Sequence, residues 1–209
     1  MICVPIRQKK TDTIIKKLLL AQKEADLSEI WFDELTNLKK ENLEKIFFKK
    51  RKPIIYKSFG NKNKIDQVLE FKPEYIDLDI KTSSLIIKDI KQKYPHTKLI
   101  ISFHDFKKTP EIKDLKIIIK EMKKKGADIC KIATYATDIS DALKILTLLS
   151  DLKEDNLDLI CLAMGKEGEF TRAAGHLLGN YLMYAPLDQN DKTASGQITL
   201  NELKKCHLK

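Results

Sequence analysis

The chain contains little arginine, little glycine and no long apolar run. Only three of its 39 basic residues are arginine, namely Arg7, Arg51 and Arg172. Arginine binds carboxylate and phosphate groups in a planar, bidentate way, so residues that are so few raise the question of what each one does. Apolar runs such as residues 18–21 are far shorter than the ~20 residues of a membrane-spanning helix. We therefore expect no membrane segment.

The four cysteines, Cys3, Cys130, Cys161 and Cys206, are far apart and form no C-x-x-C pair. No group of cysteine and histidine residues has the spacing of a zinc site, so we expect no structural metal. Unpaired and mostly buried thiols are typical of a reducing compartment. Residues 1–7 place apolar residues ahead of the charged ones, the reverse of a secretory signal. A cytoplasmic location is the prediction.

The net charge of the chain is +9 and its sequence pI is about 9.2. Such a charge is compatible with nucleic-acid binding, which is mostly electrostatic. The lysine-rich stretches 49–52 and 123–125, however, lie beside acidic residues, and no helix-turn-helix or RNP-like aromatic pattern accompanies them. We expect the lysines to form a solvated coat and no nucleic acid to bind. A basic nucleic-acid-binding protein is the weakest alternative.

Short β-rich apolar runs alternate with longer amphipathic stretches along the whole chain. Eight such strand–helix units in 209 residues predict a TIM barrel, an α/β fold of parallel strands with helical crossovers, as one domain over residues 1–209. The turn after Ile6 contains no glycine, which disfavours a Rossmann fold. The predicted strands are 2–6, 29–32, 53–59, 75–80, 98–103, 128–133, 157–163 and 181–184. The predicted helices are 11–25, 42–48, 64–71, 83–93, 110–125, 139–149, 170–178 and 200–206, with Thr109 as the N-cap of the fifth.

In a TIM barrel the active site lies at the carboxyl ends of the strands. Lys131 is the single cation inside the apolar stretch 126–134, and His104 ends the preceding strand. A desolvated lysine with a lowered pKa forms imines with carbonyl compounds, and a nearby imidazole moves protons. The alternatives are a lysine that reaches from the strand end to water and a structural histidine. Imine chemistry is the favoured interpretation because the two residues share one rim.

Five of the seven glycines lie in the last 45 residues, around Arg172. They indicate either close packing of helices on strands or loops whose backbone approaches an anionic ligand, with Arg172 binding its carboxylate. The residues leave both interpretations open.

Three stretches, residues 101–110, 126–134 and 162–198, resemble the type I 3-dehydroquinate dehydratases, the imine-forming class of the shikimate pathway of aromatic amino acid biosynthesis. The resemblance extends over almost the whole chain and implies a TIM barrel and a homodimer. It implies a carbon–oxygen lyase that uses no cofactor beyond a covalent imine between Lys131 and 3-dehydroquinate. His104 would remove the C2 proton and return it to the departing C1 hydroxyl, and the product would be 3-dehydroshikimate.

The same resemblance implies a set of residues that bind the substrate. Arg172 and Gln197 would bind its carboxylate and hydroxyl groups, with Thr193 beside them. Glu29 would contact ring hydroxyls, and Met164 and Tyr184 would form apolar walls.

The sequence departs from the family pattern at several positions. Trp31 and Phe59 stand where the family has arginine, and Asn63 stands where it has the glutamate that steadies the catalytic histidine. The closing loop has Ser195 in place of a proline and about two extra residues before it. Lys57 lies two residues before Phe59 and could replace the lost charge. A divergent or inactive protein of the same fold, acting on another cyclic keto acid, is therefore the main alternative.

Overall fold

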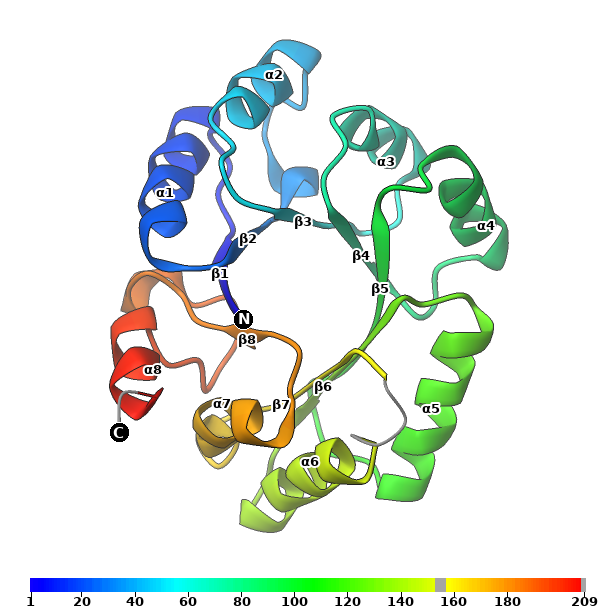
Figure 1. Cartoon of the computed structure of the whole chain (residues 1–209), viewed down its shortest axis with the longest axis vertical. Coiled ribbons are helices and arrows are strands. Elements are labelled where there is room, and N and C mark those ends of the chain that lie inside the picture. Colours follow the sequence, from blue (N-terminus) through cyan, green and yellow to red (C-terminus); the bar gives the residue numbers. More distant parts are fainter. Residues whose placement is uncertain (153–156, 208–209) are drawn as a thin grey trace.

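The computed structural model describes residues 1–152 and 157–207 of the chain. Eight parallel strands alternate with helices, and the helices surround the strands as an outer ring (Figure 1). The strands are β1 (Ile2–Ile6), β2 (Leu27–Ile30), β3 (Ile54–Lys57), β4 (Tyr75–Asp79), β5 (Lys98–Asp105), β6 (Ile129–Tyr135), β7 (Leu159–Met164) and β8 (Met183–Tyr184). The predicted TIM barrel is confirmed.

The helices follow the strands in the predicted order. They are α1 (Thr11–Glu24), α2 (Lys40–Phe48), α3 (Lys62–Leu69), α4 (Ser84–Lys93), α5 (Ile112–Lys124), α6 (Ile139–Asp151), α7 (Glu169–Ala174) and α8 (Leu200–His207). The predicted helix 170–178 is divided, because a 3₁₀ turn over Gly175–Leu178 continues α7 and ends at Gly179, whose φ is +89°. Most other boundaries agree with the prediction within about three residues.

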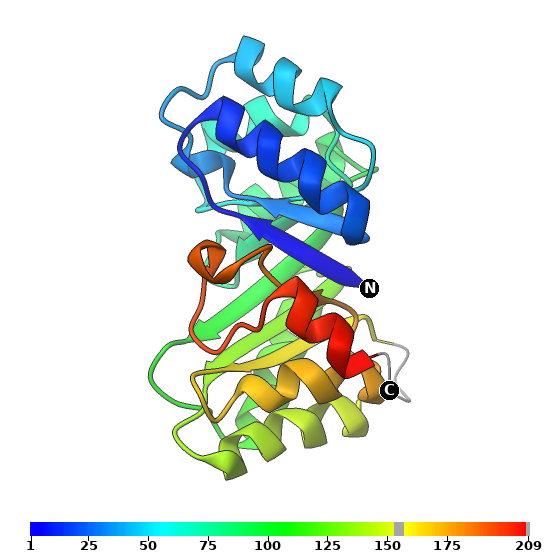
Figure 2. The ribbon, with the colours of Figure 1, turned by 90° about the vertical axis from the view of Figure 1, so that its left-hand side faces the viewer.

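The strand order β7-β6-β5-β4-β3-β2-β1-β8 leaves a seam between β7 and β8, and no residue pairing links these two strands within the described ranges. Single hydrogen bonds cross it instead: the Tyr181 amide donates to the Leu159 carbonyl over 2.9 Å, and the Asn180 Oδ1 accepts from the Cys161 amide over 2.9 Å. The first and last elements meet near this seam, with β1 and α8 facing the viewer together in Figure 2.

Alternation along the strands decides which side chains enter the barrel. On β5 and β6, Ile101 and Ile132 pack outward in the core between strands and helices, whereas Ile100 and Ile129 pack in the lumen. Because side chains two residues apart share a face, Ser102, His104 and Lys131 belong to the lumen face of these strands. Cys3, Cys130 and Cys161 are buried and unpaired, as predicted.

Two local predictions are wrong. The second strand was expected over 29–32, but β2 is Leu27–Ile30, and the chain turns into a 3₁₀ segment at Phe32. Phe32 leaves the sheet because its ring packs outside it, against the rings of Phe47 and Tyr56. Asp33, in this 3₁₀ segment, accepts a hydrogen bond from the Phe59 amide over 2.7 Å and so ties the segment to the chain that follows β3.

The fifth helix was expected to begin after an N-cap at Thr109. It begins at Ile112, and its N-cap residue, Glu111, makes no side-chain cap. The Thr109 hydroxyl lies 2.9 Å from the Thr134 hydroxyl and donates to the Tyr135 carbonyl over 2.9 Å. It therefore fastens the loop to β6, which leaves no cap for the helix.

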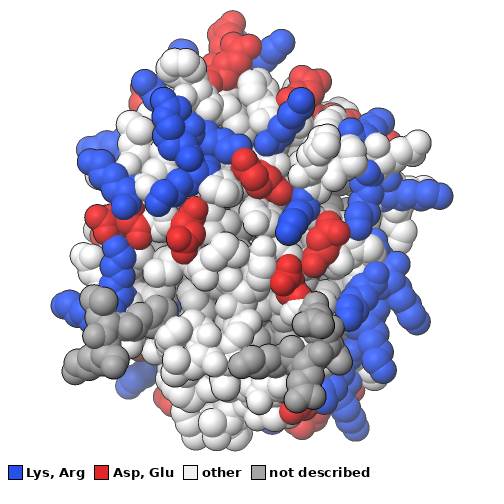
Figure 3. Space-filling model, viewed as in Figure 1, with Lys and Arg blue, Asp and Glu red and all other residues white. Residues whose placement is uncertain are grey.

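Charge is spread over the surface with both signs mixed. Acidic side chains lie among the basic ones on the face seen in Figure 3. Lysines of neighbouring helices pair with carboxylates, as in Lys116–Asp151 at 2.7 Å and Lys144–Glu111 at 2.9 Å. None of the helices in the described ranges is long and apolar enough to cross a membrane.

The seam generates a stability prediction for Asn180→Ala. Asn180 is buried, and its Nδ2 also donates to the Leu182 carbonyl over 3.2 Å. Removing the side chain leaves the buried Cys161 amide without its acceptor, so we expect the free energy of unfolding to fall by about 1–3 kcal/mol. Urea unfolding measures this loss. The exposed Asn201→Ala on α8 should change the same quantity by less than about 0.5 kcal/mol; equal values for the two variants would contradict this account of the seam.

Candidate active site

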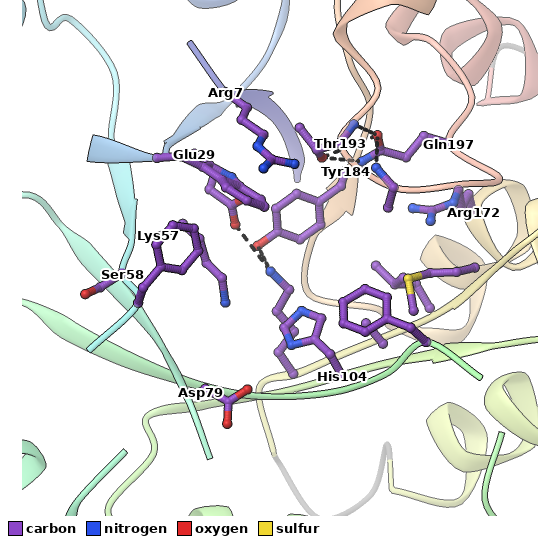
Figure 4. A pocket seen from close by; sticks show the side chains of 18 of the residues that line it. Arg7, Glu29, Lys57, Ser58, Asp79, His104, Arg172, Tyr184, Thr193 and Gln197 are labelled. Carbon is purple, nitrogen blue, oxygen red and sulfur yellow. Dashed lines mark hydrogen bonds and ion pairs between the residues drawn. The ribbon is translucent and has the colours of Figure 1, made fainter. Parts of the chain in front are cut away.

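A cavity of about 640 Å³ opens at the carboxyl ends of the strands. All eight residues singled out by sequence line it, and Figure 4 shows how most of them converge. They are Glu29, His104, Lys131, Met164, Arg172, Tyr184, Thr193 and Gln197.

Lys131 lies in the floor of the cavity with 5% of its surface exposed. Its Nζ lies 2.7 Å from the Asp77 Oδ2 and 3.3 Å from the Glu29 Oε2, and it donates to the Tyr184 hydroxyl over 3.1 Å. Burial alone would lower the pKa of Lys131, but the two carboxylates outweigh it and raise the pKa above its ordinary value. The expected lowered pKa is wrong, and Lys131 rests as an ammonium.

Asp77 is completely buried and lies between two amines. Its Oδ1 lies 2.8 Å from the Nζ of Lys57 and accepts from the Ser102 hydroxyl over 2.6 Å. Burial raises the pKa of this carboxyl, but the charges of Lys131 and Lys57 outweigh it and hold the pKa well below its usual range. Asp77 therefore stays ionised. No site role was predicted for Asp77 from the sequence; its inward, alternating position on β4 was the available signal.

His104 lies near the end of β5, on the lumen face of the strand next to that of Lys131. Its ring stacks on Phe106 with 5.9 Å between ring centroids. Enclosure in the cavity, followed by the charges of Lys57 and Lys131, lowers the pKa of His104 to about 3. The imidazole is therefore neutral at pH 7 and has a free electron pair that can accept a proton.

Glu29 contacts both the Lys131 amine and the indole of Trp31 in the cavity wall. While its Oε2 faces Lys131, its Oε1 accepts from the Trp31 indole over 2.9 Å. Tyr184 closes the opposite side, with the Lys131 Nζ 4.2 Å from the centroid of its ring. Burial raises the pKa of the Tyr184 hydroxyl well above its ordinary value, so the phenol stays neutral.

Arg172 is a buried cation in the wall of the cavity. Only 2% of its surface is exposed, and its Nε and Nη2 have no hydrogen-bond partner among the described residues. Burial lowers its pKa to about 10, which shows that the guanidinium is poorly compensated. A buried guanidinium with two free donors that lines a cavity is suited to binding a carboxylate.

The rim loop, residues 186–199, brings in Thr193 and Gln197. The Gln197 Oε1 accepts from the Thr193 amide over 2.7 Å, and its Nε2 donates to the Thr193 hydroxyl over 3.2 Å. The loop rests on the end of β7 at Gly196, where a Cβ would lie 2.2 Å from the Gly165 carbonyl oxygen. Close packing of a helix on a strand, one of the two interpretations of the C-terminal glycines, is seen at Gly168, the N-cap of α7, where a Cβ would lie 2.6 Å from the Ala163 carbonyl oxygen.

Arg7 also lines the cavity, and sequence reasoning missed this role. Its guanidinium lies 4.6 Å above the Trp31 ring and pairs with Glu34 at 2.7 Å. The rarity of arginine was the only signal in the sequence.

Phe59 meets the Trp31 ring edge-on, with 5.6 Å between the ring centroids. The two positions at which the sequence analysis noted a departure from the family pattern therefore form one aromatic wall.

Across residues 1–152 and 157–207, no cluster of histidine, cysteine and acidic side chains is arranged to hold a metal ion. The available chemistry is that of amines, an imidazole, carboxylates and guanidinium groups.

A sequence model of one protein family, described as Type I 3-dehydroquinase, matches residues 2–207. The chain belongs to this family. It is 33% identical to the 3-dehydroquinate dehydratase of Methanococcus vannielii, over 98% of this chain and 97% of that one. A second match, to the 3-dehydroquinate dehydratase of Methanosarcina mazei, is 35% identical over 64% of this chain and 56% of that one.

Solved structures of the family share the fold. The type I 3-dehydroquinate dehydratase of Clostridium difficile superposes with a TM-score of 0.84 at 23% identity, over 98% of this chain and 89% of that one. Asn63, which the resemblance matched to a glutamate beside the histidine, is exposed on α3. The charged groups that act on the pKa of His104 are Lys57, Lys131 and Asp77.

The uncompensated Arg172 generates a stability prediction. Replacing a buried, unpaired charge by an apolar side chain of similar length stabilises a protein, so we expect Arg172→Met to raise the free energy of unfolding by about 1–3 kcal/mol. Urea unfolding without added ligand measures the change. Arg51→Met, in an exposed arginine, should change it by less than about 0.5 kcal/mol. A destabilised Arg172→Met would mean that the guanidinium is satisfied within the fold.

Proposed function

We propose that this chain eliminates water from 3-dehydroquinate to give 3-dehydroshikimate, through an imine between Lys131 and the ketone of the substrate. One observation carries the proposal: a buried amine, a neutral imidazole and an unpartnered guanidinium share one cavity at the carboxyl ends of the barrel strands. Family membership and relatives named for this reaction support it.

The first step forms the imine. Lys131 must lose a proton before its nitrogen attacks the C3 carbonyl, because an ammonium has no free electron pair. The carbonyl oxygen leaves as water, and the protonated imine restores the positive charge beside Asp77 and Glu29. The two carboxylates that hold the ammonium at rest therefore also stabilise this cation.

The second step eliminates the hydroxyl. The iminium withdraws electrons from C2, so His104, which is neutral, removes the C2 proton. The same imidazolium then donates that proton to the C1 hydroxyl, which departs as water. A further water hydrolyses the imine, so one water is released overall and Lys131 returns to its starting form. No cofactor takes part in these steps.

The substrate lies between the amine and the arginine wall. Arg172 binds the carboxylate through its free Nε and Nη2. Gln197, held by Thr193, and Glu29 contact the hydroxyl groups. Met164 and Tyr184 form the apolar walls of the cavity.

A divergent imine-forming lyase for another cyclic keto acid is the second candidate. The aromatic wall of Trp31 and Phe59 favours it, because the family pattern has arginine at both positions. An inactive relative of the same fold would share this wall.

The cytoplasmic location remains a prediction, as does the homodimer. For the homodimer, light scattering should give a mass of about twice the 24.1 kDa of one chain; a mass of one chain would contradict it.

Borohydride reduction tests the imine. Incubation with 3-dehydroquinate and then borohydride should leave a stable adduct on Lys131, located by peptide mass spectrometry, because reduction turns the imine into an amine. Lys131→Met should abolish both adduct and turnover. His104→Ala should lower turnover by at least about 100-fold, the usual contribution of a general acid–base group, while adduct still forms.

Lys88→Met, in an exposed lysine on α4, is the matched control and should behave like the unaltered chain. Neither adduct nor enone absorbance from the unaltered chain would refute the proposal. An adduct with a different cyclic keto acid, and none with 3-dehydroquinate, would favour the second candidate.

A further inference from the structure

Lys57 is a second amine inside the active site, on β3. Its side chain enters the same cavity as Lys131 and is labelled in Figure 4. The residue is buried, with 8% of its surface exposed. Its Nζ lies 2.8 Å from the Asp77 Oδ1 and donates to the Ser102 hydroxyl over 3.2 Å. It is therefore already paired and is not a free cation for the substrate.

Strand register builds this arrangement. Lys57 and Asp77 are direct neighbours across β3 and β4, and Ser102 and Lys131 are direct neighbours across β5 and β6. Each oxygen of the Asp77 carboxylate consequently has its own amine, Lys57 at Oδ1 and Lys131 at Oδ2. The carboxylate is held from both sides without any contribution from a loop.

The reaction disturbs only one of these two pairs. Arg7, Asp79, Lys81 and Arg172 also line the cavity. The charged groups that act directly on the Asp77–Lys131 pair are Lys57 and Glu29, and the titratable groups that face the pair as neutral side chains are His104, Tyr184 and Cys3. When Lys131 becomes a neutral amine, Lys57 is the remaining cation in this set. Without Lys57, a completely buried carboxylate would lose its last counterion during every turnover, at a large cost in free energy.

We propose that Lys57 is a positioning residue of the reaction. It is the permanent counterion of Asp77 and keeps this carboxylate fixed while Lys131 loses its proton and forms the imine with the substrate. This inference rests on the proposed function, because it assigns Lys57 a task within the imine step. Burial is the main cause of the low pKa of His104, and the positive charge of Lys57 lowers it further, so the neutral imidazole is able to accept the C2 proton.

Lys57→Met removes the charge and keeps most of the side-chain stem. Lys131 should then hold its proton more tightly, because it becomes the only cation paired with Asp77. We expect the rate of borohydride-trapped adduct formation at pH 7 to fall by about tenfold, the effect of one pKa unit. Lys57→Arg, which keeps the charge, should retain most of the rate, and Lys88→Met all of it.

An NMR titration of the His104 ring separates this role from general damage to the fold. Removing the positive charge should move the midpoint of the His104 titration to higher pH in Lys57→Met and leave it unchanged in Lys57→Arg. Damage to the fold alone would slow trapping without moving the midpoint in this direction. An unchanged midpoint together with an unchanged trapping rate would overturn the inference, while adduct in the unaltered chain would leave the proposed function intact.

If Lys57→Met does not fold, a pair of variants built on Asp77→Asn carries the test. Once Asp77 is neutral, Lys57 has no carboxylate to hold, so adding Lys57→Met to Asp77→Asn should change the trapping rate by less than about twofold. A further tenfold loss in the double variant would show that Lys57 acts on the substrate directly, which would also overturn the inference.

Discussion

The active site depends on one shared carboxylate. Asp77 has no exposed surface, and it remains charged because an ammonium lies at each of its oxygens. This single interaction fixes the side chain of Lys131 and sets the charge of the cavity floor. Burial, followed by the charges of Lys57 and Lys131, lowers the pKa of His104, and Asp77 opposes this shift. A buried carboxylate of this kind is costly alone and stable only as part of a set, so the residues around it form one unit.

The alternation of side chains along the strands brings the residues of this unit together. Lys57, Asp77, Ser102 and Lys131 come from four adjacent strands and meet because each lies on the inward face. The opposite wall is less regular: Arg172 comes from a short helix, and Gln197 comes from a loop. The rigid strands thus hold the groups that exchange protons, and the segments beyond the strands supply the groups suited to binding an anion and hydroxyls.

Sequence reasoning reached the fold and the cavity residues but not the electrostatics. The eight alternating strand–helix units could be predicted because each strand is a short apolar run. The pKa of Lys131 was misjudged because its partners, Asp77 and Glu29, are 54 and 102 residues away in the chain. Arg7 was missed for a related reason, since only the folded chain places it over Trp31. Interactions between distant residues, rather than local propensity, separate the prediction from the structure.

The contact between Gly165 and Gly196 gives the rim loop an uneven tolerance to change in length. The loop is fastened at its downstream end, where Gly196 lies against the backbone at the end of β7. Residues added upstream of Asp191, which pairs with Lys17 of α1, would lengthen the loop while Gly196 still holds Gln197 in place. A residue added after Gly196 would instead carry Gln197 out of register with the cavity. Insertions in this enzyme are therefore tolerated better in the upstream part of the rim loop than between Gly196 and Gln197.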